Sequence, residues 1–495
     1  TVGSGRWLRL FSGAINARWF GLKAGDAAAQ DTNKTAMLAL FAYAATLSSS
    51  TILIPDGTYN LRCDFSGSIL NVPAGATIIH GENTTIVVDN AGSSERWVVY
   101  RINNASNCKI IGGVIEGDKT TVLSGGYYGY GISIGGTSNN IKVEGITIKN
   151  CYMDAVLCET TGRADAVFVN CKFTGCRRAG ASVSQGTRIR FIGCSFESTS
   201  GLGASEAGVN IEVESAGNVS DVLFDACRFA SNGTIGAYVH QGFGAGIPVR
   251  IAFVNGCVFE ANGSLGANVL DADGVSFADC LFVDNGTDAC SIADSTNCRV
   301  SNSYISGGNK GVYLLRSQRV LVAQNHIVDT ADSAIATADS TASGSQLSSI
   351  TISGNMISNS GEHAIDFRGS DSAITQNVID GAQKDGIRVS ASTGIGNNVI
   401  AGNQVFSSGL AADNTWRGIA DSGACNRVSG NLVRHHKRSV RDTAAAGGAS
   451  SITLSSRASN IDDYYNGMVV SIASGTGSGQ TQTITDYVGS TKVAT

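Results

Sequence analysis

The sequence has little charge, almost no proline and no long apolar run. Asp, Glu, Lys and Arg make up 15% of the 495 residues, and only 3 residues are proline. Disordered chains are usually rich in charge and proline, so this composition excludes one. With 62 glycines it is typical of a turn-rich β protein. The sequence has no run of 18 apolar residues and no signal peptide, so we expect no membrane insertion.

Basic tracts and metal-binding motifs are also missing. The net charge of -5 and a pI near 5.7 argue against a nucleic-acid partner. No Cys-x-x-Cys pair and no Cys/His cluster has the spacing of a zinc site. The sequence therefore indicates no cofactor, and it leaves a divalent cation open.

One pattern recurs along the chain: a Cys or Asn, then any residue, then an apolar residue. Steps between successive marked positions run from 20 to 33 residues, which indicates a repeat architecture. The marked positions are Cys151, Cys171, Cys194, Cys227, Cys257, Cys280, Asn302, Asn325, Asn355, Asn377, Asn403 and Asn431.

Short runs with alternating apolar residues surround each marked position, and no helical stripe lies between them. Ile141-Lys142-Val143 and Ile350-Thr351-Ile352 are typical of short strands, two or three per repeat. This predicts an all-β fold, a right-handed parallel β-helix from about residue 51 to 434, with handedness following the usual preference of parallel crossovers. Equivalent residues would stack about 4.8 Å apart.

Such stacking turns the marked positions into a ladder. Each Asn can donate its amide N–H to the carbonyl oxygen of the next Asn, which satisfies a buried polar group in every coil. Stacked cysteines pack like small apolar residues, and their side chains point the same way, which is poor geometry for a disulfide. We therefore expect the thiols to be free and buried.

An amphipathic helix is predicted before the first coils. Asp31 or Thr32 can cap a helix from Asn33 to about Leu47, whose apolar face would be Met37, Leu38, Phe41 and Ala45. A helix here would cover the open end of the solenoid. We expect an N-terminal segment with this capping helix at 1–50, the β-helix at 51–440 and a small β module at 441–495.

The segments on either side of this helix carry a resemblance. Asn16-Ala17 followed by Trp19-Phe20-Gly21, then a strand ending in Ile54-Pro55-Asp56-Gly57-Thr58-Tyr59, resembles the opening of pectate-lyase-like β-helices. That opening is frequent in bacteriophage tailspikes, and with the ladder the resemblance covers about residues 14–440. Asp-Asp-Tyr-Tyr-Asn-Gly at 462–467 and Gly-Thr-Gly-Ser-Gly-Gln at 475–480 resemble a module of phage tail proteins. Because the chain starts at Thr1 and ends inside an expected strand, we expect it to be a fragment.

Polar side chains gather on one outer face of the predicted solenoid. Alternation points Asn210 and Glu212 outward, and on the next coil Tyr238 and His240. Stacking would bring Glu212 to about 5 Å from His240, with Glu159 two coils away at about 9.6 Å. Long segments flank this patch, at 197–207 and 241–248, as the walls of a cleft would. Arg177, Arg178, Glu214 and Asn268 are predicted to complete the substrate site.

Two chemistries fit this patch. In a polysaccharide lyase Arg177 or Arg178 would neutralise a substrate carboxylate, His240 would act as base and Tyr238 as acid. In a hydrolase two carboxylates would act, Glu159 with Glu212 or Glu212 with Glu214. The Tyr–His pair favours the lyase slightly. The structural alternative is a surface ion pair between Glu212 and His240.

Other polar positions are interpreted as structural. Asp366, Arg368 and Arg388 form a second cluster that is self-neutralising, and four aspartates are interpreted as turn formers: Asp271, Asp273, Asp294 and Asp339. Tyr128-Gly129-Tyr130-Gly131 resembles a segment of the mannuronan epimerases, which carry Asp and His next. Ile132 and Ser133 stand there in this chain, so epimerase activity is not expected.

The resemblance implies a phage tailspike that binds and cleaves a bacterial surface polysaccharide, an O-antigen or a capsule. It also implies a homotrimer on the virion tail, folded in the host cytoplasm. The alternatives are a non-catalytic glycan-binding adhesin or structural spike and, less favoured, a secreted enzyme of the pectate-lyase type.

Overall fold

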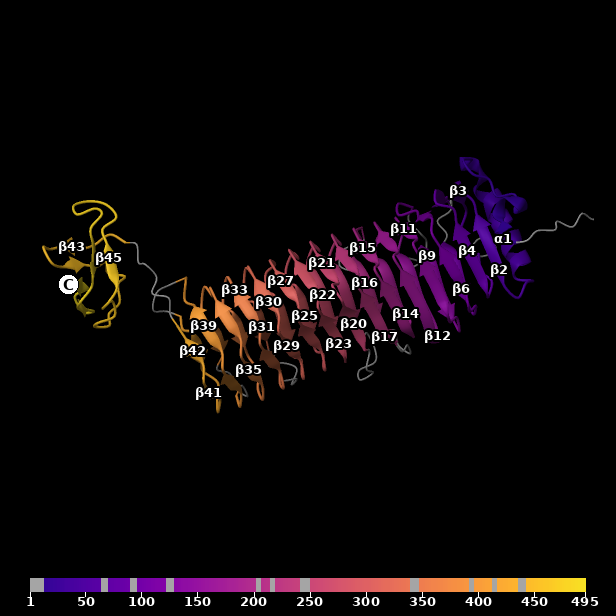
Figure 1. Cartoon of the computed structure of the whole chain (residues 1–495). Coiled ribbons are helices and arrows are strands. Elements are labelled where there is room, and N and C mark those ends of the chain that lie inside the picture. Colours follow the sequence, from indigo (N-terminus) through magenta and orange to yellow (C-terminus); the bar gives the residue numbers. More distant parts are fainter. Residues whose placement is uncertain are drawn as a thin grey trace, which may run out of the picture.

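The computed structural model of the chain describes residues 13–63, 70–89, 96–121, 129–201, 206–213, 219–240, 250–338, 347–390, 396–411, 416–434 and 442–495. From β2 (Ser50–Ile54) to β42 (Leu432–Val433) the chain winds through stacked coils that form an elongated rod, with α1 (Gln30–Ala44) at its N-terminal end (Figure 1). The predicted parallel β-helix is confirmed. Every strand pairing of the rod is parallel, within one 27-stranded and one 15-stranded sheet.

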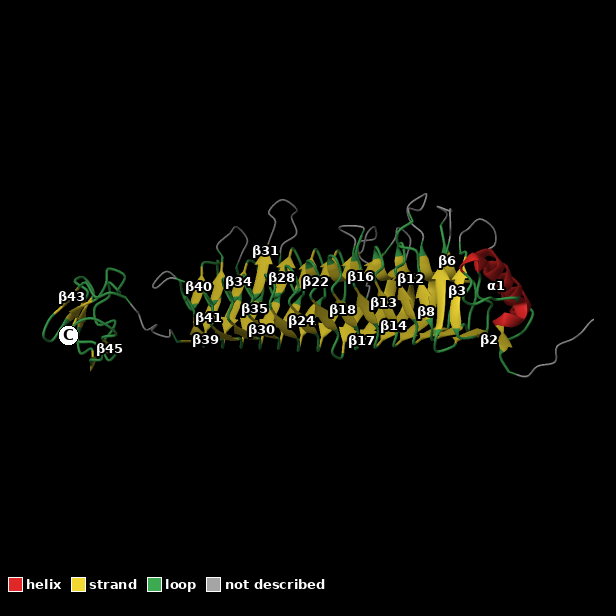
Figure 2. Cartoon of the chain, turned by 90° about the horizontal axis from the view of Figure 1, so that it is seen from above, coloured by secondary structure: helices red, strands yellow, loops and turns green. Residues whose placement is uncertain are grey.

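Three walls surround the core of the rod (Figure 2). The 15-stranded sheet, from β3 (Gly57–Leu61) to β42, is one wall. The larger sheet supplies the other two walls. Its long strands β12 (Asp154–Val169) and β14 (Ala179–Ile192) turn a corner, and each pairs with neighbouring strands before and after that corner. One of these two walls runs from β1 (Ile15–Asn16) through β2 and β10 (Ile141–Glu144) to β41 (Arg427–Ser429).

The remaining wall carries the candidate site and is called the site wall. Its strands, in stacking order, are β6 (Val98–Asn103), β9 (Tyr130–Gly136), β12 (Asp154–Val169), β14 (Ala179–Ile192), β16 (Ala207–Glu212), β19 (Ile235–His240), β22 (Leu265–Leu270), β25 (Cys290–Ala293), β28 (Val312–Leu315), β31 (Ile335–Ala338), β34 (Ile365–Phe367), β37 (Ile387–Val389) and β40 (Ile419–Asp421).

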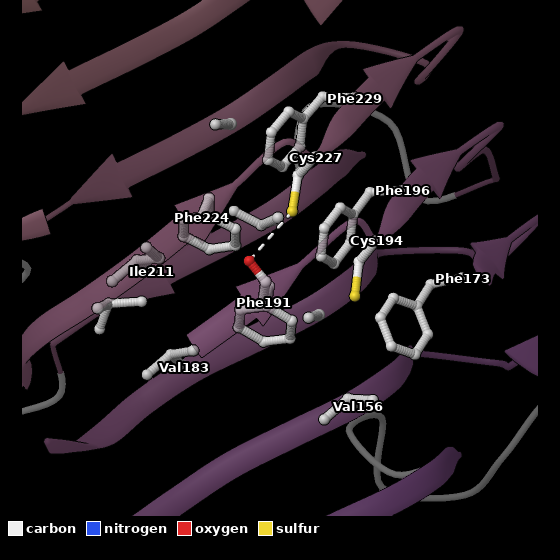
Figure 3. Packing of buried hydrophobic residues seen from close by; sticks show 14 of the residues in the cluster. Val156, Phe173, Val183, Phe191, Cys194, Phe196, Ile211, Phe224, Cys227 and Phe229 are labelled. Carbon is white, nitrogen blue, oxygen red and sulfur yellow. Dashed lines mark hydrogen bonds between the residues drawn. The ribbon is translucent and has the colours of Figure 1, made fainter. Parts of the chain in front are cut away.

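Aromatic rings form two continuous stacks in the middle of the core (Figure 3). Phe191 lies 5.0 Å from Phe224, centroid to centroid, and Phe196 lies 5.1 Å from Phe229, in each case one coil apart. These spacings match the distance between paired strands. All four rings are fully buried, so the core is held by dispersion contacts that repeat at every coil.

The predicted ladder is present, with two corrections. Asn302 is exposed with φ of 51°, and the ladder position is Ser303, whose hydroxyl accepts from the Cys280 amide at 3.1 Å. Cys151 belongs instead to a second ladder, in which it stacks with Cys176. For each of these two cysteines, a backbone amide one coil further along the chain donates to the cysteine carbonyl. The sequence pattern marked the wrong residue at both points, because another Cys or Asn stands within five positions of the true ladder position.

The ladder's polar groups are paired as expected. Asn355 donates from Nδ2 to Asn377 Oδ1 at 2.9 Å, and Asn377 donates to Asn403 Oδ1 at 2.9 Å. Among the described residues, which include all 13 cysteines, no disulfide forms, and every thiol except that of Cys425 is buried.

Replacing Asn377 with alanine should lower the free energy of unfolding by about 1–3 kcal/mol, because the amide groups of Asn355 lose a buried acceptor. Urea denaturation followed by circular dichroism measures the change. Asn139, an exposed residue, is the matched control, and its alanine variant should unfold with the wild type. Equal midpoints for the two variants would contradict a stabilising ladder.

The N-terminal helix begins three residues earlier than predicted and ends at Ala44. Asp31 lies inside its first turn and pairs with Arg62 at 2.5 Å, so neither Asp31 nor Thr32 is the cap. The buried face contains Met37 and Phe41 as expected, and also Leu40, while Ala45 is exposed. The helix packs onto the first coil and covers core side chains that would otherwise face solvent (Figure 2).

The C-terminal residues form antiparallel sheets with a small core of their own. One sheet contains β43 (Ala446–Gly447), β44 (Ile452–Thr453), β47 (Tyr487–Val488) and β48 (Val493–Ala494), and β45 (Val469–Ser471) pairs with β46 (Thr481–Thr483). Tyr465 and Tyr487 pack edge to face at 4.6 Å inside it.

Candidate functional site

The strand register places the predicted pair of the candidate site on adjacent coils. Glu212 on β16 is opposite His240 on β19, and Asn210 is opposite Tyr238 in the same ladder. Their side chains stand on the outer face, because Val209, Ile211 and Val239 point inward and are buried. Parallel strands lie about 4.8 Å apart, so an ion or a sugar atom at this point can contact both coils.

The Tyr238 and His240 rings are stacked on each other, with centroids 5.5 Å apart and planes inclined by 16°. Partial burial raises the pKa of Tyr238 above its usual value, and the nearby carboxylates of Glu212 and Asp271 raise it further. The phenol therefore keeps its proton at neutral pH, as a proton donor must. The stacking fixes the direction of both side chains.

Asn210 holds the Glu212 carboxylate on the same strand. It is buried, and its Nδ2 donates to Glu212 Oε2 at 3.2 Å. Its Oδ1 has no hydrogen-bond partner among the described residues, although a buried carbonyl oxygen usually accepts one. Asn268 is opposite Tyr238 on β22 and is half-buried. The four residues Asn210, Glu212, Tyr238 and His240 are called the Glu212 cluster below.

Arg178 does not present a free charge to the Glu212 cluster. Its guanidinium group makes a two-point ion pair with Asp154, at 2.9 Å and 2.5 Å, and also donates to Ser182 Oγ at 3.3 Å. Burial alone would lower the pKa of Arg178, but Asp154 and, more weakly, Tyr130 and Glu212 raise it above its usual value. The role predicted for Arg178, neutralising a substrate carboxylate, is weakened because Asp154 already balances its charge.

Asp154 is the residue that sequence reasoning missed. It is the first residue of β12, it is fully buried, and it also accepts the amide N–H of Ala179 at 3.1 Å. Nothing in its sequence neighbourhood distinguishes it from a turn aspartate. Arg177, the other predicted cation, lies over the Tyr152 ring at 4.2 Å and donates to the Gly201 carbonyl.

Glu159 is not aligned with Glu212 as the alternation predicted. It is exposed on β12 and pairs with Gln185 of β14 across a register shift that begins after Cys158. Ser184 is the extra residue of β14, and continuing the register from Ile211 places Ser184 beside Glu212. A single inserted residue is a β-bulge, which no alternation pattern reveals. The hydrolase pair Glu159–Glu212 is therefore out of line.

Several predicted positions lie outside the described residues: Glu214, Asp339, the segment 241–248 and four residues of the segment 197–207. Asp271 and Asp294 have positive φ of 52° and 48°, as the turn prediction requires.

The second polar cluster lines a cavity of about 440 Å³ on the site wall. Asp366 and Arg388 make a two-point ion pair at 2.8 Å and 2.5 Å, and Arg368 lies 3.5 Å from the same carboxylate. The Asp366 charge is therefore neutralised within the cluster, but the cluster as a whole keeps one guanidinium group in excess and is not fully self-neutralising as predicted. The cavity itself was not predicted, because most of its lining comes from turns that precede the strands.

Within the described part of the chain, no group of three or more His, Cys, Asp or Glu side chains is placed to hold a metal ion. No helix in that part of the chain is long and apolar enough to cross a membrane.

The stacked three-walled coils define a parallel β-solenoid. The family model for the right-handed β-helix region matches residues 76–250 and 248–405, so the chain belongs to the right-handed β-helix family and the predicted handedness is confirmed.

Solved structures with the same fold are only distantly similar in sequence. The A-module of the Azotobacter vinelandii mannuronan C-5 epimerase AlgE4 has 13% identity and a TM-score of 0.57, covering 84% of this chain and 100% of its own. A mutant tailspike protein of E. coli bacteriophage HK620, in complex with a pentasaccharide, has 14% identity and a TM-score of 0.55, covering 84% of this chain and 80% of its own. At these identities the likeness shows the fold alone. A comparison with curated sequences finds no match.

Proposed function

We propose that this protein binds and cleaves a bacterial surface polysaccharide, an O-antigen or a capsule, at the Glu212 cluster. The observation that carries the proposal is the register that pairs Glu212 with His240 and stacks Tyr238 on His240 at 5.5 Å. An acid, a base and a carboxylate on two adjacent coils of an outer face form a general acid–base site. The similarity in fold to a tailspike in complex with a pentasaccharide agrees with a glycan ligand.

The favoured reaction is β-elimination. The His240 imidazole takes the C5 proton next to the carboxylate of a uronic acid unit. The electron pair of the broken C5–H bond then forms the C4–C5 double bond. The C4–O bond breaks, and the leaving oxygen takes the Tyr238 proton. Asn210 would face the substrate carboxyl group. The alternative is hydrolysis with Glu212 as one of two carboxylates, which needs a second acid close to it.

A panel of purified capsules and O-antigens tests the proposal. Cleavage should lower the viscosity of at least one polysaccharide and release oligosaccharides. A lyase product absorbs in the ultraviolet through its new double bond, whereas hydrolysis gives a reducing end without that absorbance. Retention of a polysaccharide without shortening would identify a glycan-binding adhesin instead and would contradict cleavage.

We further propose that the protein is a homotrimer of a virion tail that acts on the host surface. Apolar side chains stay exposed on the 15-stranded sheet, with Tyr304 at 40% and Met356 at 53%. Because water-exposed apolar surface favours association, light scattering at micromolar concentration should give three times 50.9 kDa. A mass of one chain would contradict the trimer.

A further inference from the structure

The residues that line the cavity around the second polar cluster come from four successive coils. Asp332, Glu362 and Lys384 stack in one line, because the amide of Glu362 donates to the Asp332 carbonyl at 3.4 Å and that of Lys384 to the Glu362 carbonyl at 3.0 Å. Asp366 and Arg388 approach the same cavity from β34 and β37. The cavity of about 440 Å³ is thus surrounded by polar groups on a rigid frame.

Every carboxylate that lines this cavity has a cationic partner among the described residues. Asp332 pairs with Lys310 at 3.0 Å, Glu362 pairs with Lys384, and Asp366 pairs with Arg388. These pairs hold acceptors and donors in fixed directions and leave almost no net charge. A phosphate or a uronate would need surplus cations, so the lining fits an uncharged ligand with many hydroxyl groups.

His363 supplies a polar atom that has no partner. It is 2% exposed, and its Nδ1 lies 3.3 Å from Asp385 Oδ2 and 3.1 Å from the Asp385 amide nitrogen. Nε2 is buried without a hydrogen-bond partner among the described residues. With the proton on Nδ1, Nε2 accepts; with the proton on Nε2, it donates. Either tautomer leaves one hydrogen bond for a ligand hydroxyl group.

An aromatic ring stands beside the cavity. The half-buried Trp416 ring meets the His363 ring edge to face at 5.7 Å, and Lys384 Nζ lies 5.3 Å from its centroid. A sugar ring has an apolar C–H face and a rim of hydroxyl groups. A half-buried aromatic ring next to fixed donors and acceptors matches both features, as ligand pockets generally combine them.

We propose that this cavity is a second carbohydrate site, which binds an uncharged sugar unit of the polysaccharide that is cleaved at the Glu212 cluster. This inference rests on the proposed function. The two sites share the site wall, and Tyr238 on β19 and Asp366 on β34 are five strand steps apart, about 24 Å at 4.8 Å per step. A chain of several sugar units lying along the rod spans that distance, so the second site holds the polymer while the first cleaves it.

The test measures retention separately from cleavage. Glu212→Gln, expected to bind without cleaving, is the parent, and its ligand is the purified polysaccharide that the wild type retains. Adding Glu362→Gln or His363→Ala should weaken binding by at least about tenfold, the loss of one charge-assisted or buried hydrogen bond. Adding His326→Ala, an exposed histidine on the 15-stranded sheet, is the control and should change nothing. Melting temperatures check folding, and the partly exposed Glu362 protects the test if His363→Ala unfolds.

Unchanged binding in both cavity variants would overturn the second site and leave cleavage untouched. A wild type that retains a polysaccharide without shortening it would contradict the cleavage and leave this comparison valid. Ionic strength tests whether the bound sugar is charged. When the ionic strength is raised tenfold, the loss of retention caused by Glu362→Gln should change by less than about threefold. A loss that disappears at high salt would mean a charged sugar and would overturn the uncharged class. Polysaccharide binding at this cavity should change the tryptophan fluorescence, and that change should vanish in Trp416→Phe.

Discussion

His240→Ala should lower the rate of polysaccharide cleavage by about 10²–10⁴-fold, the typical contribution of a general acid or base. Glu212→Gln should lower it as well, because the Glu212 carboxylate lies opposite His240 and would stabilise the imidazolium formed in β-elimination, or would be one of the two carboxylates of hydrolysis. Both side chains stand on the outer face and contribute little to packing, so the melting temperature should stay within about 2 °C of the wild type. Initial rates at saturating polysaccharide, measured by release of oligosaccharides, give the effect on kcat. The double variant should be little slower than the slower single variant, because residues acting as one unit are not additive.

Matched controls separate chemistry from surface charge. Glu260→Gln removes a half-buried glutamate that pairs with Arg228 at 2.8 Å, and His326→Ala removes an exposed histidine. Both lie on the 15-stranded sheet, and both should keep full activity. Full activity in Glu212→Gln and His240→Ala would place the chemistry elsewhere, at the cavity of Asp366 and Arg388 first.

Tyr238→Phe distinguishes the two mechanisms within the same site. In the lyase the phenol protonates the leaving oxygen, so its loss should lower kcat about as much as the loss of His240. In the hydrolase the ring only stacks, and phenylalanine keeps that contact at nearly full rate.

The repeat pattern was sufficient to predict the coils, because each coil must bury the same apolar positions. It could not fix the exact ladder residue where two candidates were adjacent, as at Asn302 and Ser303. The outward pairing of Glu212 with His240 followed from alternation, since no bulge interrupts β16 or β19. Glu159 failed for the opposite reason, because β12 and β14 contain register shifts.

Contacts between coils of unequal length could not be predicted from the sequence. Asp154 and Arg178 are 24 residues apart, and their pairing depends on where each chain segment turns into its strand. The cavity beside β34 has the same origin: its lining residues belong to turns whose stacking is set by the strands around them. A turn aspartate and a site aspartate look alike until the coil above and the coil below are known.

Asp154→Ala should lower the free energy of unfolding by about 3–5 kcal/mol, the cost of leaving a buried charge without its partner. The Arg178 side chain is only 17% exposed and the Asp154 side chain 0%, so water cannot replace the lost carboxylate. The amide of Ala179 also loses its acceptor. Urea denaturation followed by circular dichroism measures the loss, and in a solenoid it can appear as a separate early transition of the coils around β12.

Asp165→Ala is the control, since that partly exposed carboxylate pairs with the exposed side chains of Arg163 and Arg188 and should cost less than about 1 kcal/mol. A second comparison isolates the charge: Asp154→Leu combined with Arg178→Met should recover most of the stability, because removing both partners leaves no buried ion. If Asp154→Ala and Asp165→Ala unfold at the same urea concentration, the buried pair does not hold this corner of the site wall.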